Sequence, residues 1–147
     1  MAWTIDPAHT SVGFSAKHLG VSTVRGLFRN FDSDIDLPDD GDLTKARGRV
    51  DVDAASIDTG SEQRDGHLRS PDFFDVEQFP TITFEARSIA RDGDRYRVVG
   101  DLMIKGVTRE VTLYLEDAAV VEDPFGNTKV GGTLTGTINR SDWDLKW

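Results

Sequence analysis

The chain has 147 residues and a formal net charge of −9, a length that fits a single domain with a sizeable core. It contains no cysteine, which excludes disulfides, thiolate metal sites and thiol nucleophiles. A negative surface repels phosphate backbones and anionic lipid, so we expect neither nucleic-acid binding nor electrostatic docking on a membrane. We predict one domain over residues 1–147.

The N-terminal sequence shows no targeting signal. Met1-Ala2-Trp3-Thr4-Ile5 lacks the basic and apolar regions of a signal peptide. No apolar run in the chain approaches the ~18 residues that a membrane span needs. We therefore expect a cytoplasmic protein without an integral membrane segment.

Apolar and polar residues alternate through most of the chain, as is typical of antiparallel strands with one solvated face. The alternating segments are 12–18, 24–29, 47–54, 81–87, 96–104, 111–116 and 133–139. Asp40-Gly41, Asp92-Gly93 and Lys105-Gly106 predict short hairpin turns, and Asp123-Pro124-Phe125-Gly126-Asn127 predicts a longer loop. The pattern predicts an all-β protein, either a meander that closes into a barrel or a sandwich.

One segment, residues 59–80, interrupts the alternation. Thr59-Gly60-Ser61-Glu62 has capping-box spacing and predicts a short helix through Leu68. Ser70-Pro71 predicts a second short helix, which carries Phe73 and Phe74 and ends before Pro80. We interpret this insert as a cover over the mouth of a barrel that holds an apolar ligand.

The sequence offers little for catalysis or metal binding. His9, His18 and His67 do not have metal-ligand spacing, and neither a nucleophile elbow nor a nucleotide-binding glycine loop is present. Asp65 and His67 form a conceivable but generic acid–base pair. We expect no catalytic residue, no metal site and no cofactor.

Strand parity predicts which side chains face the interior. The apolar candidates are Phe14, Phe28, Ile82, Phe84, Leu102, Ile104, Leu113, Leu134 and Ile138. The same parity holds five glycines, Gly26, Gly48, Gly100, Gly132 and Gly136. They either leave room for a ligand or ease the bending of the strands, so a filled and a hollow barrel both remain open. Arg140 shares this parity and is expected to pair with Asp65 or Asp6, as a structural clamp or as a contact for a ligand head group.

The order of several motifs resembles the YceI-like family of polyisoprenoid-binding proteins. The matching stretches are Trp3-Thr4-Ile5-Asp6-Pro7-Ala8-His9, Val24-Arg25-Gly26-Leu27-Phe28, Arg64-Asp65-Gly66-His67-Leu68, Asp72-Phe73-Phe74-Asp75-Val76, Gly100-Asp101-Leu102-Met103-Ile104-Lys105-Gly106 and Asn139-Arg140-Ser141-Asp142-Trp143. They span nearly the whole chain.

The resemblance implies an extended antiparallel lipocalin-like β-barrel with a short helical insert near residues 60–78. It implies reversible binding of a long apolar ligand, a polyisoprenoid chain, an isoprenoid quinone or another amphiphile, for carriage or storage. Relatives are often homodimers, which implies a homodimer here, and many are periplasmic. They usually continue into a further strand after the segment that matches 139–145, so we expect an unpaired sheet edge here.

Within this reading, Phe73 and Phe74 are expected to cap the ligand, while His18, Arg64 and Arg140 lie near its head group. Two alternatives remain. One is an enzyme acting on a prenyl or quinone substrate, with Asp65 and His67 as acid and base. The other is a structural or stress protein whose barrel is filled by its own side chains.

Overall fold

The computed structural model describes residues 2–3, 10–18, 22–38, 40–122, 124 and 128–145. These residues are mostly strand, with one α-helix. The strands are β1 (Ala2–Trp3), β2 (Val12–His18), β3 (Ser22–Phe28), β4 (Phe31–Asp36), β5 (Arg47–Asp53), β6 (Ile57–Asp58), β7 (Thr81–Asp92), β8 (Arg95–Ile104), β9 (Val107–Glu122) and β10 (Thr128–Thr135). The helices are α1 (Glu62–Arg69) and the short 3₁₀ helices η2 (Leu43–Lys45), η3 (Ala54–Ser56) and η4 (Arg140–Trp143).

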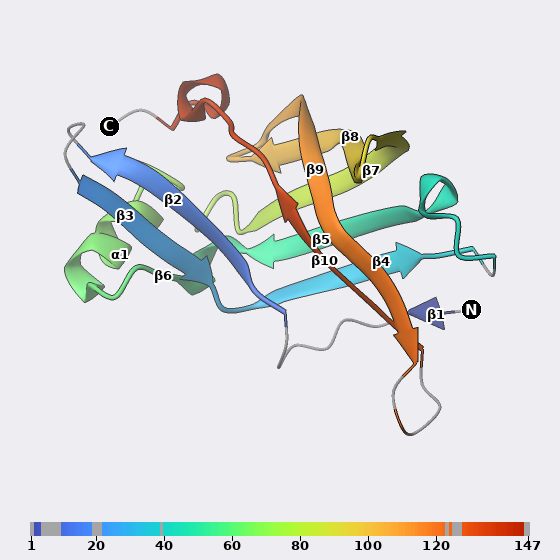
Figure 1. The fold of residues 1–147 in the computed structure, drawn as a ribbon. Helices are drawn as coiled ribbons and strands as arrows, with labels where there is room; N and C mark the ends of the chain where they lie inside the picture. The colour runs from blue at the N-terminus through green and yellow to red at the C-terminus, as the bar shows by residue number, and fades with distance from the viewer. Residues whose placement is uncertain are drawn as a thin grey trace.

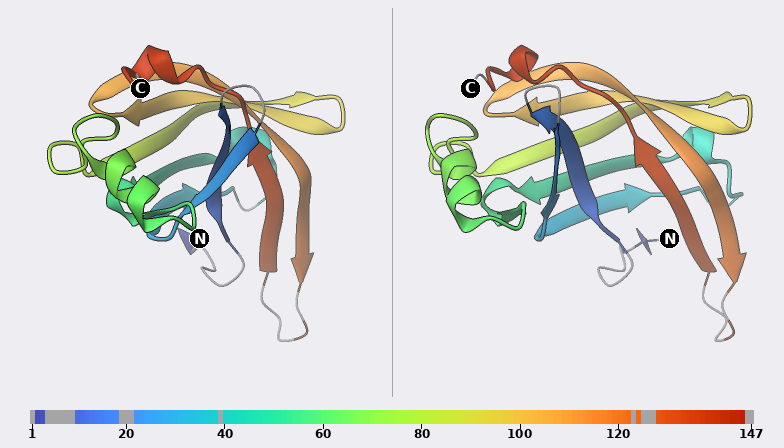
Figure 2. Two further views of the ribbon diagram at one scale, coloured as in Figure 1. Left: turned by 90° about the vertical axis from the view of Figure 1, so that its left-hand side faces the viewer. Right: turned by 60° about the vertical axis from the view of Figure 1, so that its left-hand side comes forward.

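The strands form two antiparallel sheets that curl into a half-barrel (Figure 1). The larger sheet has the order β1-β4-β5-β7-β8-β9-β10, and the smaller one has the order β2-β3-β6. The helix α1 lies at one end of the curl and the β7–β8 hairpin at the other (Figure 2). The predictions of an all-β fold and of a helical insert near residues 60–78 are confirmed.

Two of the predicted hairpin turns are confirmed. Lys105 and Gly106, with φ angles of 53° and 76°, join β8 to β9, and Gly93, with a φ of 63°, joins β7 to β8. The prediction of a short hairpin at Asp40-Gly41 was wrong. The connection there runs from residue 37 to 46, because Asp42 caps η2 by accepting a hydrogen bond from Thr44 N. Of the predicted loop 123–127, only Pro124 lies within the described residues.

Strand boundaries differ from the prediction at two places. The alternation predicted a strand over 133–139, but β10 ends at Thr135. The chain turns away because Asn139 caps η4, accepting a hydrogen bond from Ser141 N at 3.2 Å. Sequence patterns also gave no prediction for β4, although its side chains alternate in burial along Phe31–Asp36. The strand was not predicted because three of its six residues are aspartates, which are rare in strands.

The core lies on the inner, concave face of the curl. Its buried members come from five strands, from the segment after α1 and from the segment around η4: Phe28, Val52, Ile57, Phe73, Phe74, Ile104, Val111, Trp143 and Leu145. Half-buried apolar side chains of the strands continue this surface. The helix and η4 thus cover one end of a curved sheet whose inner face is apolar.

Candidate functional site: an apolar trough on the inner face

The inner face forms a trough whose floor runs across five strands. Cross-strand register aligns Phe31 with Val52 and Ile82, and Val50 with Phe84 and Leu102. Directly opposed residues of antiparallel strands share a face, so these rows and Leu113 line one continuous surface. We use the term trough for this surface: Phe14, Phe28, Phe31, Val50, Val52, Ile82, Phe84, Leu102, Ile104, Val111 and Leu113. Most of the predicted lining residues are brought together in it.

Glycines of the inner face do not leave empty space, which corrects one argument for a hollow barrel. A Cβ on Gly26 would lie 2.5 Å from Phe14 Cζ, and a Cβ on Gly100 would lie 2.7 Å from Phe84 Cζ. The ring of one strand therefore lies flat over the glycine of the next. Leu115 and Leu113 cover Gly132 and Gly136 in the same way. These contacts give the trough a smooth wall of rings and leucines.

Phenylalanines close the trough at the α1 end. Phe73 and Phe74 are each 8% exposed, and their ring centroids lie 4.8 Å apart at an interplanar angle of 87°. Phe74 meets Phe28 edge-on at 6.1 Å, and Phe28 contacts Phe14 at 5.7 Å. The predicted second helix was wrong: residues 71–74 form hydrogen-bonded turns, with Phe73 N and Asp75 N both donating to Ser70 O.

Hydrogen bonds hold α1 in place beneath these rings. The helix begins after Ser61, whose side chain accepts from Arg64 N, so the predicted cap at Thr59 was displaced by two residues. Asp65 is 3% exposed and accepts from Thr59 N at 3.0 Å and from Thr59 Oγ1 at 2.6 Å. Arg64 donates from Nε to Thr59 Oγ1 at 2.8 Å and from Nη2 to Thr59 O at 2.9 Å. Asp65 therefore stabilises the start of the insert.

An ion pair links β3 to β6 within the smaller sheet, just before the insert begins. Arg29 follows β3 and contacts Asp58 of β6 at 2.7 Å. The side-chain hydrogen bond from Arg29, followed by the backbone N–H of Gly60, lowers the pKa of Asp58 below its ordinary value. Both side chains are substantially exposed, so this pair fixes geometry more than it adds stability.

Trp143 closes the trough beside the phenylalanines and was not among the predicted site residues. It is 2% exposed, and its Nε1 donates to Leu102 O at 2.9 Å. Arg109 Nε donates to Asp142 O at 2.7 Å and Lys105 Nζ to Asp144 O at 3.3 Å, which fastens η4 to the β8–β9 hairpin. The signal in the sequence was Trp143, four residues after the helix-capping Asn139. A large apolar ring with one N–H donor is usually buried next to an acceptor.

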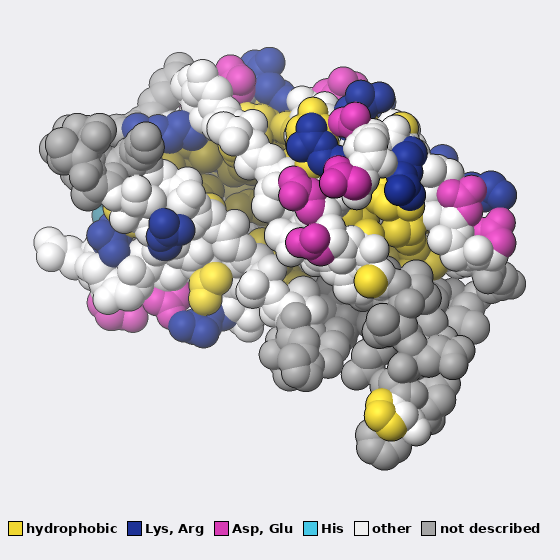
Figure 3. Space-filling model, in the orientation of Figure 1, with side chains coloured by type: hydrophobic (Ala, Val, Ile, Leu, Met, Phe, Trp, Pro, Cys, Tyr) yellow, Lys and Arg dark blue, Asp and Glu magenta, His cyan; other side chains and the backbone are white. Residues whose placement is uncertain are grey.

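The side of the trough along β10 is exposed. Leu134 and Ile138, both predicted to lie inside, are 44% and 39% exposed. Figure 3 shows hydrophobic side chains on the floor of a hollow that lies between β2 and β10 in the view of Figure 1. In the described part of the chain, β10 pairs with β9 alone and β2 with β3 alone.

The interior placement of Arg140 was wrong. Arg140 is exposed and belongs to η4, because the strand parity that predicted its direction ends at Thr135. Asp65, its expected partner, accepts instead from Thr59. The backbone of His18 ends β2, and its side chain lies outside the described residues, as does Asp6.

The residues considered for catalysis have other contacts. His67 Nε2 lies 3.4 Å from Asp72 Oδ2, while the Asp65 carboxylate accepts hydrogen bonds from Thr59. Among the described residues, no group of three or more His, Cys, Asp or Glu side chains is placed to hold a metal ion. Within the same residues, no helix has the length and apolar character needed to cross a membrane.

Two clefts lie at the corner where β3 turns into β4. One, of about 360 Å³, is lined by Phe28, Arg29 and neighbouring residues. The other, of about 490 Å³, lies between the β4 and β5 ends and includes Val52 and Pro80. Both clefts are lined by Phe31, a residue of the trough.

Comparison with known proteins places this geometry in a family. The model of the YceI-like domain matches residues 3–147. A UPF0312 protein of Staphylococcus aureus strain N315 is 40% identical over 146 residues, which are 99% of this chain and 82% of the relative.

Solved structures share the fold. The YceI protein of Campylobacter jejuni superposes with a TM-score of 0.79 and 34% identity, over 97% of this chain and 84% of that one. A polyisoprenoid-binding domain from Saccharophagus degradans has a TM-score of 0.55 and 15% identity, over 90% of this chain and 74% of that one, and shows the fold alone. From the match over residues 3–147, together with the shared half-barrel of strands, it follows that the chain belongs to the YceI-like family.

Proposed function

We propose that the protein binds one long apolar ligand reversibly in the trough, a polyisoprenoid chain or an isoprenoid quinone, and carries or stores it. The observation that carries this proposal is a continuous apolar inner face, closed at one end by Phe73 and Phe74 and exposed at its β10 side. An apolar groove with polar strand faces around it is typical of ligand-binding sites.

The mechanism would be burial without bond chemistry. Each methylene that leaves water contributes about 0.8 kcal/mol, so a long prenyl chain gains enough to outweigh the cost of its own ordering. The smooth wall made by the Phe14 and Phe84 rings over glycines suits a chain that must slide in and out. A structural neighbour that shares this fold is described as a polyisoprenoid-binding domain.

Native mass spectrometry with added geranylgeraniol tests the proposal. We expect a stoichiometric complex with the unaltered chain. Leu134→Asp, which puts a carboxylate on the exposed rim of the trough, should weaken binding about tenfold or more, because a leucine contact contributes about 1.5–3 kcal/mol. The matched control is Thr133→Asp, since its side chain lies on the other face of β10 and should leave binding unchanged.

Solvent extraction of the purified protein, followed by lipid identification, would name the natural ligand. A different long-chain lipid would keep the binding mechanism and change the ligand class. A ligand-free mass, with no uptake of added prenyl lipids, would contradict the proposal and favour a barrel filled by its own side chains.

A further inference from the structure

We propose that Arg91 and Tyr96 form a head-group site for an anionic amphiphile, a prenyl or alkyl phosphate or carboxylate, at the end of the trough opposite α1. This inference rests on the proposed function, because it assigns the polar end of the same ligand. The two residues are directly opposed in the β7–β8 register. Neither was predicted from the sequence as a site residue.

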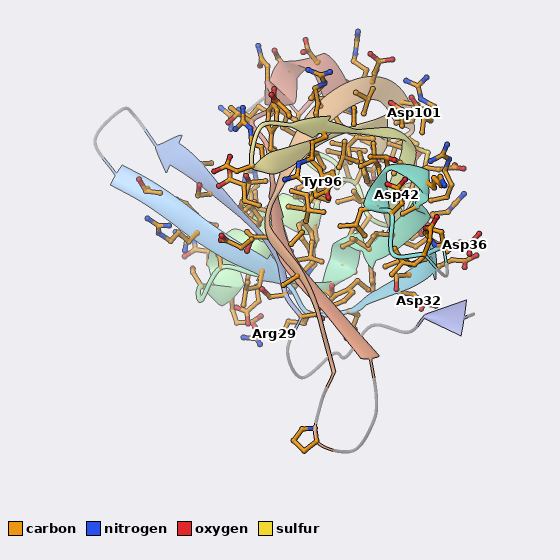
Figure 4. All side chains as sticks on the ribbon, turned by 45° about the vertical axis from the view of Figure 1, so that its right-hand side comes forward. Arg29, Asp32, Asp36, Asp42, Tyr96 and Asp101 are labelled. Carbon is orange, nitrogen blue, oxygen red and sulfur yellow. The ribbon has the colours of Figure 1, made fainter. Side chains whose placement is uncertain are left out.

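The register places both side chains on the inner face. Tyr96 shares its strand parity with Val98, Leu102 and Ile104, and it is opposed on the other side by Leu115. Leu115 is in turn opposed by Leu134. Figure 4 shows Tyr96 beneath the curled sheet, whereas Asp101 of the same strand lies on the outside.

Arg91 and Tyr96 lie far from the end of the trough that Phe73 and Phe74 close. Ile104, which packs in the core with Phe74 and Trp143, is eight positions from Tyr96 along β8, or about 27 Å at strand spacing. The β7–β8 hairpin and α1 occupy opposite ends of the curl (Figure 2). A chain whose tail reaches the phenylalanines would therefore bring its head to Arg91.

The chemistry of the pair suits an anionic oxygen. Arg91 donates from Nε to Gly93 O at 2.9 Å and from Nη1 to Tyr96 Oη at 3.1 Å, and its guanidinium lies 5.2 Å from the Tyr96 ring centroid. In the described part of the chain these contacts use two of its five N–H donors, so three remain for a ligand. The Tyr96 hydroxyl accepts from Arg91 and can still donate. A positioned guanidinium with a free edge matches phosphate and carboxylate.

Arg91 and Arg95, two arginines of the same hairpin, differ in whether a carboxylate pairs with them. Arg95 lies on the outer face, stacked 3.9 Å over the Tyr114 ring, and its cation is compensated by Asp92 at 3.6 Å and Glu116 at 3.9 Å. Among the described residues, no carboxylate pairs with Arg91. Both arginines thus stack on a tyrosine, Arg91 on Tyr96 of the hairpin and Arg95 on Tyr114 of β9. Of the two, Arg91 is the one that keeps its charge available in a protein of net charge −9.

The test compares geranylgeranyl phosphate with geranylgeraniol, which differ only in the head group. We expect the unaltered protein to prefer the phosphate. Arg91→Gln should weaken phosphate binding about tenfold, as for the loss of one charged hydrogen-bonding group, and leave alcohol binding unchanged. Arg91→Lys should keep part of the preference, because the charge remains. Arg95→Gln, on the outer face, should behave like the unaltered protein.

The outcomes separate this inference from the proposed function. Binding of the alcohol by all variants, with an unchanged preference for phosphate in Arg91→Gln, would overturn the head-group site and leave the trough intact. An equal loss for both ligands in Arg91→Gln would show that Arg91 only holds the hairpin, and would also overturn the site. If the unaltered protein took up neither ligand, the proposed function and the head-group site would both fall.

Discussion

At the scale of single residues, several glycines of the inner face lie beneath side chains of the neighbouring strand. A glycine at an inward position has no side chain to fill the interior. Counting the inward-facing glycines therefore favours a hollow barrel. Yet the rings of Phe14 and Phe84 lie over Gly26 and Gly100. A pairing of this kind protects the glycine backbone and stiffens the strand pair. The glycines therefore shape the wall of the trough, and its opening lies elsewhere.

Substituting two inner-face glycines should separate these roles. Gly100→Ala would drive a methyl group into Glu85 O and the Phe84 ring, and overpacking of this kind costs about 1–3 kcal/mol. Gly48→Ala is the matched control, since its Cβ would meet only Ile35 Cγ1 at 3.6 Å and Asp34 O at 3.8 Å. We expect its free energy of unfolding to stay within about 1 kcal/mol of the original. Urea unfolding curves measure both, and equal losses would contradict this account.

At the scale of elements, the insert depends on polar contacts as much as on its phenylalanines. Thr59 and Asp65 join the start of the segment to the helix, and Arg69 Nε donates to Ala55 O at 2.9 Å. Since residues 71–74 form turns and not a helix, the placement of Phe73 and Phe74 relies on these contacts. The stability of the closed end of the trough therefore depends on the hydrogen bonds of α1.

We predict that Asp65→Ala will destabilise the protein by about 1–3 kcal/mol, because the partly buried Thr59 N–H and hydroxyl lose their acceptor. Asp72→Ala is the control in the same insert. Its side chain is 72% exposed and faces His67 at 3.4 Å, so the change in stability should stay within about 0.5 kcal/mol. Thermal or urea unfolding would decide, and a harmless Asp65→Ala would show that the phenylalanines alone hold the insert.

Strand patterns also show how far sequence can predict such a site. Alternation along 96–104 predicted β8 and its inward residues, and the inward residues Ile82 and Phe84 of β7 were equally clear. A bulge then intervenes in β7, where Ala86 opposes Gly100 but Ser88 opposes Val99. The extra residue, Arg87, reverses the parity of everything after it. Arg91 consequently faces inward, although simple alternation from Ile82 would place it outside.

At the scale of the whole molecule, the strands of the half-barrel differ in how many neighbours they pair with. Strands β7 and β8 each pair with a neighbour on both sides, whereas β10 pairs with β9 alone among the described strands. Its residues 131–135 are all exposed. An unpaired edge of this kind is the part of a sheet that opens most readily and that other strands can join.

Amide hydrogen exchange should measure this difference in stability between β8 and β10. We expect the amides of residues 131–135 to exchange at least about tenfold faster than those of β8, which corresponds to ~1.4 kcal/mol less opening free energy. A prenyl ligand that rests on Leu134 should slow exchange in β10 more than in β4 and β5, because β10 is the unpaired edge whose opening these contacts oppose. Mass spectrometry of peptic fragments, with and without geranylgeraniol, measures both effects. Slow exchange in β10 without ligand would mean that another strand covers this edge in solution, and a repeat across protein concentrations would show whether a second copy supplies it.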